Sequence, residues 1–211
     1  MRLHRKVLQW IIEGMLKKTF KWGGIILLVL YIVLVIYRGF VLRAEEKTNE
    51  QVAKIHATKL ALVDVMGENL PPVPSDPDSS VAGVDANKNG IRDDVELAIF
   101  AEYPNSARTR AVLLQYALAL QMEVTQELVN TGTVIAVAQE KSRAAGCIAD
   151  VTPRDDIQKF ITITQQLTDF VKEKHINTNE RDQAQVSFYE KLGSYSDIED
   201  ICDIELSTLP N

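Results

Sequence analysis

The 211-residue sequence predicts an all-α protein in which a single N-terminal transmembrane helix is followed by an extracytoplasmic helical domain. Three observations predict this: a long uncharged apolar run near the N-terminus, a reversal of charge across that run, and apolar residues at helical spacing through most of the remaining chain. We expect five segments, namely a basic amphipathic segment at 1–21, the transmembrane helix at 22–42, a juxtamembrane helix at 43–68, a proline-rich linker at 69–82 and a helical domain at 83–211.

The apolar run begins at Trp22 and reads WGGIILLVLYIVLVIY to Tyr37. Continued to Leu42 it forms about 31 Å of helix, enough for a hydrocarbon core of about 30 Å. A cleaved signal peptide is the alternative, but the basic region before the run is long and no small-x-small cleavage pattern follows it. We therefore expect a signal-anchor that contacts membrane lipid through residues 22–42.

The charge of the two flanks predicts the topology. Residues 1–43 hold eight Lys and Arg residues and one acidic residue, a net charge of +7, whereas residues 44–211 carry −13. The positive-inside rule then places the N-terminus in the cytoplasm and the C-terminal domain outside the cell membrane. We separately expect the envelope to be bacterial. The basic segment at 1–21 either lies on the inner leaflet as an amphipathic helix or forms a partly ordered tail. An outer domain this acidic excludes nucleic acid as a partner.

The juxtamembrane segment has no proline or glycine before Gly67, so we expect the membrane helix to continue into an amphipathic one. It carries His56, which we interpret as a surface or packed residue. The linker holds four of the seven prolines and predicts a semi-rigid extended connector, with a docking site for a partner protein as the alternative.

Five helices are expected in the C-terminal domain. In chain order they are 95–103 stopped by Pro104, a helix capped by Ser106 that runs to about Asn130, 133–147 ending near Gly146, a helix with Thr152 as N-cap and Pro153 at its first position, and 179–192 closed by Gly193. The Val- and Ile-rich start of the third could also form a strand.

The two cysteines, Cys147 and Cys202, both fall on the predicted outer side. In an oxidising compartment we expect them to form a disulfide, which fastens the acidic C-terminal tail to the core. Two buried free thiols are the alternative.

The stretch DANKNGIRDDVE, residues 85–96, is rich in oxygen ligands at a regular spacing. Calcium takes six to eight oxygens from a loop that curls around it, with ligands at positions 1, 3, 5, 7, 9 and 12 and a glycine turn at position 6. Gly90 occupies the turn, and the ligand positions hold Asp85, Asn87, Asn89, Ile91 through its carbonyl, Asp93 and Glu96. We therefore predict one Ca²⁺ site here, and an Asn-Gly turn with a capping acid cluster is the alternative.

This loop resembles EF-hand-type loops, and more closely the D-x-D-x-D-G-x-x-D loops of thrombospondin type 3 and dockerin-like modules. The resemblance covers residues 84–96 and implies calcium binding. Asn87 and Asn89 stand where that pattern has Asp, and the preceding segment is proline-rich rather than helical. The resemblance therefore predicts a site of modest affinity without the paired second hand of a sensor.

The sequence shows no catalytic motif that would indicate an enzyme: it lacks H-E-x-x-H, C-x-x-C, G-x-S-x-G and phosphate-binding glycine loops. We expect a membrane-anchored, extracytoplasmic calcium-binding protein, a structural or interaction module of the cell envelope with a possible protein partner and no small-molecule substrate. Two alternatives stay open: an accessory subunit of a larger membrane complex, and an envelope hydrolase with an unrecognised carboxylate site.

Overall fold

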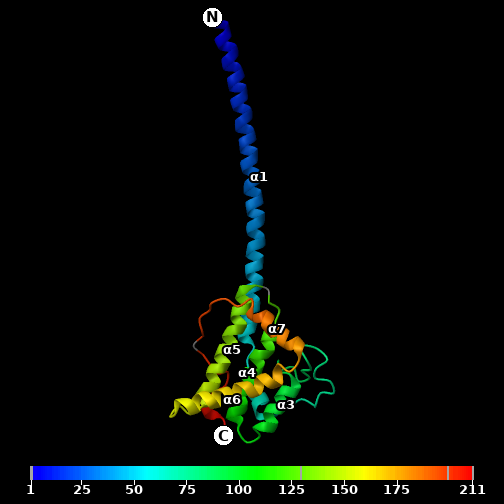
Figure 1. Cartoon of the computed structure of the whole chain (residues 1–211). Helices are drawn as coiled ribbons and strands as arrows, with labels where there is room; N and C mark the ends of the chain where they lie inside the picture. The colour runs from blue at the N-terminus through cyan, green and yellow to red at the C-terminus, as the bar shows by residue number, and fades with distance from the viewer. Residues whose placement is uncertain (1, 129, 199, 211) are drawn as a thin grey trace. The chain divides into compact units, whose positions relative to one another are not determined.

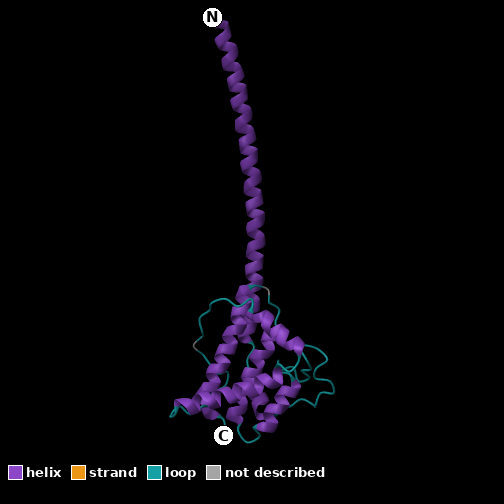
Figure 2. Ribbon diagram, viewed as in Figure 1, coloured by secondary structure: helices purple, strands orange, loops and turns teal. Residues whose placement is uncertain are grey.

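Every regular element of the structure is helical. The computed structural model describes residues 2–128, 130–198 and 200–210, and within these ranges it contains no strand (Figure 2). The elements are α1 (Arg2–Ala57), α2 (Leu62–Met66), α3 (Asp93–Glu102), α4 (Ala107–Thr125), α5 (Thr131–Val151), α6 (Ile157–His175), α7 (Asn179–Tyr189) and the 3₁₀ turn η1 (Leu206–Thr208) (Figure 1). The predicted all-α fold class is confirmed.

The chain divides into two units, residues 1–49 and 50–211. The first unit consists of the N-terminal part of α1, whose apolar side chains between Ile25 and Ile36 are exposed. By length and composition α1 can cross a membrane. The side chains of most of residues 1–21 lie outside the described set, and with them the expected amphipathic character of that segment.

The second unit is built around α4, which packs against α2, α3, α5, α6 and α7. Every residue of α4 from Arg110 to Glu123 is buried, as expected for a helix enclosed on all sides. The core around it includes Val95 and Ile99 of α3 and Val137 of α5. This packing holds the start of α3, where the predicted ligand loop ends, against the centre of the unit.

The juxtamembrane helix is interrupted, contrary to expectation. α1 ends at Ala57 and α2 begins at Leu62, although residues 58–61 contain neither proline nor glycine. The backbone N–H of Leu60 donates to Asp203 Oδ2 at 3.0 Å instead of to a helical carbonyl. A tertiary hydrogen bond from the distant tail thus accompanies a break that no local signal indicates.

Side-chain N-caps begin α4, α5, α6 and α7, and the sequence identified only the cap of α4. Ser106 caps α4 as predicted, by accepting from Thr109 N, but α4 ends at Thr125 rather than near Asn130. The expected start of α6 at Thr152 is wrong, because the Thr152 hydroxyl donates back to Ile148 and α5 continues to Val151. Asp156 caps α6 instead.

Candidate metal centre

The loop from Asp85 to Glu96 is curled by its own first residue. The carboxylate of Asp85 accepts hydrogen bonds from the backbone N–H groups of Asn89, at 3.2 Å, and Gly90, at 3.0 Å. Lys88 (φ 59°) and Gly90 (φ 84°) both adopt the left-handed conformation that reverses the chain. A Cβ on Gly90 would also lie 2.8 Å from Leu118 of α4, so the turn needs a glycine.

The second half of the loop is the first turn of α3. Asp93 and Glu96 lie in this turn, and both side chains are fully buried. The carboxylate of Asp93 accepts from the backbone N–H of Ala86 at 3.0 and 3.2 Å, while Asp93 N donates to Val84 O at 2.9 Å. These bonds close the loop by joining its beginning to the start of the helix.

Glu96 reaches across the closed loop to both asparagines. Its Oε2 accepts from Asn87 Nδ2 and from Asn89 Nδ2, each at 3.0 Å. The other oxygen, Oε1, is buried and has no hydrogen-bond partner among the described residues. A buried acceptor without a partner costs about 1–3 kcal/mol, more when it is charged, so a cation or a hydrogen-bond donor beside this oxygen would stabilise the loop.

The surroundings of the loop disfavour the ionised form of two of its carboxylates, those of Glu96 and Asp93. Burial raises the pKa of Glu96 to about 7, and the negative charges of Asp64 and Asp93 contribute to the rise. Burial likewise raises the pKa of Asp93, to which the charge of Asp85 adds. A divalent cation at this position would reverse both effects, because it favours the ionised carboxylates.

Of the six predicted ligands, the structure brings Asn87, Asn89 and Glu96 into direct contact. It holds Asp85 and Asp93 in the same loop by backbone hydrogen bonds, and Ile91 is buried at the seventh position. In the described part of the chain, no group of three His, Cys, Asp or Glu side chains is close enough to hold a metal ion. The predicted set relies on two amides and one backbone carbonyl besides its three carboxylates, and these residue types suit calcium.

Two residues near the loop were missed by the sequence reasoning. The backbone carbonyl of Asn69 accepts from Asn87 Nδ2 at 2.8 Å, and the Asn69 side chain donates to Asp64 Oδ1 at 3.2 Å. Asp64 lies on α2 and is buried. The sequence signal for Asp64 was its place between two apolar neighbours, Val63 and Val65, in a segment whose apolar residues recur at helical spacing.

The linker before the loop is fixed by one fully buried side chain from α7, Arg181. Its guanidinium donates to the carbonyls of Pro77, Ser80 and Val81 at 2.9–3.1 Å and to the carboxylate of Asp78. The hydrogen bond from Arg181 lowers the pKa of Asp78. The linker is thus held by the planar donors of one guanidinium rather than by proline stiffness alone.

A second fully buried arginine, Arg92, joins the loop to the end of α6. It forms a bidentate pair with Asp94, at 2.6 Å for both contacts. It also donates to the C-terminal carbonyls of α6 at Lys174 and His175. The last carbonyls of a helix lack helical partners, so Arg92 caps α6 while it fixes the first turn of α3.

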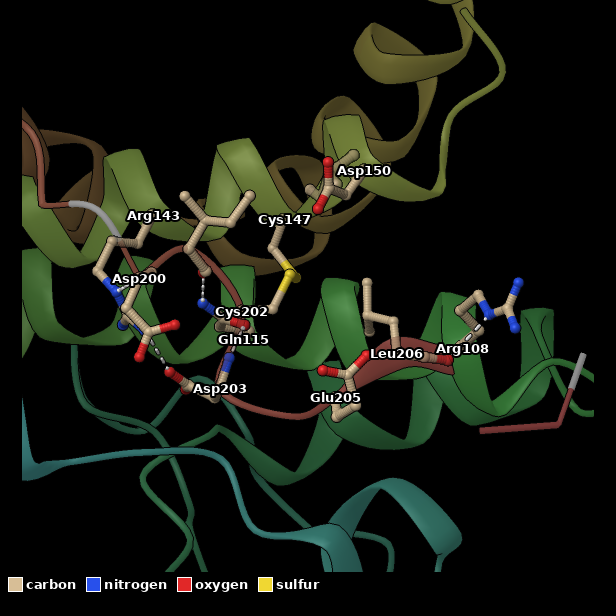
Figure 3. Close-up of a disulfide and its surroundings, with 12 residues drawn as sticks. Arg108, Gln115, Arg143, Cys147, Asp150, Asp200, Cys202, Asp203, Glu205 and Leu206 are labelled. Carbon is tan, nitrogen blue, oxygen red and sulfur yellow. Dashed lines mark hydrogen bonds and ion pairs between the residues drawn. A yellow bond between two sulfur atoms is a disulfide. The ribbon is translucent and has the colours of Figure 1, made fainter. Parts of the chain in front are cut away.

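The predicted disulfide joins Cys147 of α5 to Cys202 of the tail, with a Cα–Cα distance of 5.1 Å (Figure 3). The side chain of Gln115 holds the same stretch twice, by donating to Ile201 O at 2.8 Å and accepting from Asp203 N at 3.0 Å. Arg108 adds a hydrogen bond to Leu206 O. The prediction of a tail fastened to the core by its cysteine is confirmed.

A cluster of ion pairs lies where the tail meets the juxtamembrane segment. Glu140 of α5 contacts His56 at 2.7 Å and Lys59 at 3.0 Å, and it also pairs with Arg143. Arg143 in turn contacts Asp203 at 3.0 Å. His56 is therefore a packed residue of a structural network, as interpreted from the sequence.

A cavity of about 270 Å³ beside the disulfide is lined by acidic and apolar residues of α5 and the tail: Asp150, Asp200, Ile201, Cys202, Ile204, Glu205 and Leu206. Figure 3 shows Asp150, Asp200 and Glu205 around this stretch.

Comparisons with protein-family models, with curated proteins and with solved structures found no match to this chain.

Proposed function

We propose that the protein is a single-pass membrane protein whose extracytoplasmic domain binds one calcium ion as a structural cofactor, and that it serves as a structural or interaction module of the cell envelope. The observation that carries the calcium proposal is the fully buried Glu96, with one oxygen unpartnered and the other directed at Asn87 and Asn89. The curvature of the loop around Asp85 and the oxygen-bearing groups at its ligand positions also suit calcium.

Binding would exchange the two amide N–H donors on Glu96 for the cation and supply the partner that Oε1 lacks. Small turns of the Asn87 and Asn89 amides would direct their oxygens toward the ion, while the Asn87 nitrogen keeps its hydrogen bond to Asn69 O. Three carboxylates and the absence of a paired loop are typical of dissociation constants on the order of 10⁻⁴–10⁻³ M, as in extracellular modules. At that affinity the ion stabilises the fold rather than transmits a signal.

Support for the membrane anchor comes from α1, which is long and apolar enough to span a bilayer. The charge of +7 before residue 44 against −13 after it favours a cytoplasmic N-terminus. The disulfide agrees with this orientation, since such bonds persist in oxidising compartments and are rare in the cytosol.

Calcium titration of the full chain in detergent, followed by thermal unfolding, tests whether the protein binds calcium. At a tenfold excess over the dissociation constant, binding to the folded state adds about 1.4 kcal/mol, so the melting temperature should rise by a few degrees. Asp85→Asn and Glu96→Gln should remove most of this rise. Asp76→Asn, which neutralises an exposed acid of the linker, is the matched control and should keep it. Equal melting of wild type in millimolar calcium and in chelator would refute the calcium proposal.

Protease added to intact cells or spheroplasts tests the orientation. It should cleave the acidic domain without lysis and leave a protected N-terminal fragment. Cleavage of that domain only after lysis would reverse the proposed topology.

A further inference from the structure

Asp64 is a buried carboxylate that lies outside the loop. It belongs to the short helix α2 and is 4% exposed. Within the described residues its carboxylate accepts a hydrogen bond from Asn69 Nδ2 at 3.2 Å and forms no ion pair within 4 Å. A buried negative charge with one neutral donor is costly unless a cation lies near it.

The partner of Asp64 leads directly to the ligand loop. Asn69 donates to Asp64 through its side chain and accepts from Asn87 Nδ2 through its carbonyl, at 2.8 Å. The same Asn87 nitrogen lies 3.0 Å from Glu96 Oε2. Three hydrogen bonds in sequence therefore connect the carboxylates of Asp64 and Glu96.

The packing of α2 places Asp64 on the side of the loop. α2 ends at Gly67, which has φ 77°. A Cβ on Gly67 would lie 2.9 Å from the ring of Phe100 on α3, the helix that also carries Glu96. The C-terminal end of α2 therefore lies against α3 at this point.

We propose that Asp64 is a fourth carboxylate of the cation site, supplied from outside the twelve-residue loop, and that it acts on the cation by its charge while Asn69 positions it against Asn87. The inference rests on the proposed calcium function and deepens it. A site with four carboxylates favours cations of higher charge, and its occupancy stabilises α2 as well as the start of α3.

The test compares Asp64→Asn with Glu68→Gln in the full chain in detergent, by calorimetric titration with Ca²⁺ and separately with Tb³⁺. Asp64→Asn keeps an acceptor for Asn69 and removes only the charge. Glu68→Gln removes the charge of an exposed acid four residues away. We expect Asp64→Asn to weaken Ca²⁺ binding about tenfold, and Tb³⁺ binding about thirtyfold because Coulomb energy scales with the charge of the ion. Glu68→Gln should change either affinity less than about twofold.

The ratio of the losses in Ca²⁺ and Tb³⁺ affinity separates an effect of the Asp64 charge from a structural effect. A purely structural role for Asp64 would weaken both ions by the same factor, and that result would overturn the proposal, as would an Asp64→Asn variant with the affinity of Glu68→Gln. If wild type itself binds neither ion, the proposed calcium function fails instead. Should Asp64→Asn not fold, Asp64→Glu and Asp64→Gln give the same comparison at equal side-chain length: the Glu variant must bind Ca²⁺ more tightly than the Gln variant, and equal binding would overturn the proposal.

Discussion

His175 Nε2 lies 2.8 Å from Gln121 Oε1 in the interior of the helical unit, where His175 is fully buried. The Gln121 amide nitrogen donates to Ala82 O, so its oxygen faces the imidazole and we assign the proton to Nε2. Burial, together with the charges of Arg92 and Arg181, lowers the pKa of His175 to about 3. The folded state therefore holds this histidine neutral.

The first prediction concerns acid stability. A histidine whose folded pKa lies below its unfolded value of about 6.5 contributes stability that is present above pH 6.5 and is lost as pH falls toward 3. With calcium in excess, we expect the free energy of unfolding to fall by about 2 kcal/mol between pH 6.5 and pH 5. His175→Gln, which can still donate to Gln121, should remove this part of the slope. Identical pH profiles for wild type and variant, measured by thermal unfolding, would contradict the assignment.

The second prediction concerns Glu96 in chelator, where the sign is opposite. Its folded pKa, about 7, lies above the unfolded value, so its contribution is present below about pH 4.5 and is lost as pH rises to 7. Acidification from pH 7 to 5 should therefore stabilise the ion-free protein through Glu96 by on the order of 2 kcal/mol, which offsets the loss through His175. In chelator, the free energy of unfolding of Glu96→Gln should therefore fall more steeply on acidification than that of wild type. A variant profile that parallels wild type would show that Glu96 does not titrate in this range.

The third prediction concerns Gly83, two residues before the first residue of the loop. It has φ 68°, and a Cβ there would lie 2.6 Å from Arg92 Cγ and 3.0 Å from Pro77 O. Arg92 cannot move without breaking its pair with Asp94. Gly83→Ala should therefore lower the free energy of unfolding by about 2–3 kcal/mol. Gly193→Ala, where nothing lies within 4 Å of the added Cβ, is the control and should change it by less than about 0.5 kcal/mol. Two variants of equal stability would mean that the linker does not pack against Arg92.

The fourth prediction concerns the disulfide, which joins residues separated by 55 positions. The chain-entropy estimate for a loop of this length is about 4 kcal/mol. At about 2–4 °C per kcal/mol for a domain of this size, replacement of Cys147 and Cys202 by alanine should lower the melting temperature by about 8–16 °C, and reduction of wild type should do the same. Alkylation of protein isolated without reductant checks the bond itself, since two modified thiols would show that it does not form in the cell.

Helix type followed from the sequence because apolar periodicity and the Ser106 cap are local signals. The break at residues 58–61 was not predictable, because Asp203 binds Leu60 N across 143 positions of sequence. The predicted start of α6 was wrong because the residue with the composition of a cap forms a different hydrogen bond. Thr152 has the composition of an N-cap, but its hydroxyl bonds backward to Ile148, and Asp156 caps the helix instead.

The loop residues could be named from spacing, since curvature around an ion requires ligands at alternate positions and glycine at the sixth. Their surroundings could not. Asp64, Asn69 and Arg181 reach the loop or its linker only through tertiary packing. The apolar neighbours of Asp64 indicate that it is buried, but not that it lies near the loop. Sequence spacing therefore identified the candidate ligands but not the residues that position them.

The contacts of Arg181 with the linker bridge 100 to 104 positions of sequence. The entropy of closing loops of that length has to be overcome before such contacts form, and non-local contacts of this kind slow folding. Residues 77–81 can form these contacts only when α7 is docked. A fragment containing residues 69–96 alone, transplanted into another protein, would therefore lack Arg181 and the hydrogen bonds that hold the linker before the loop.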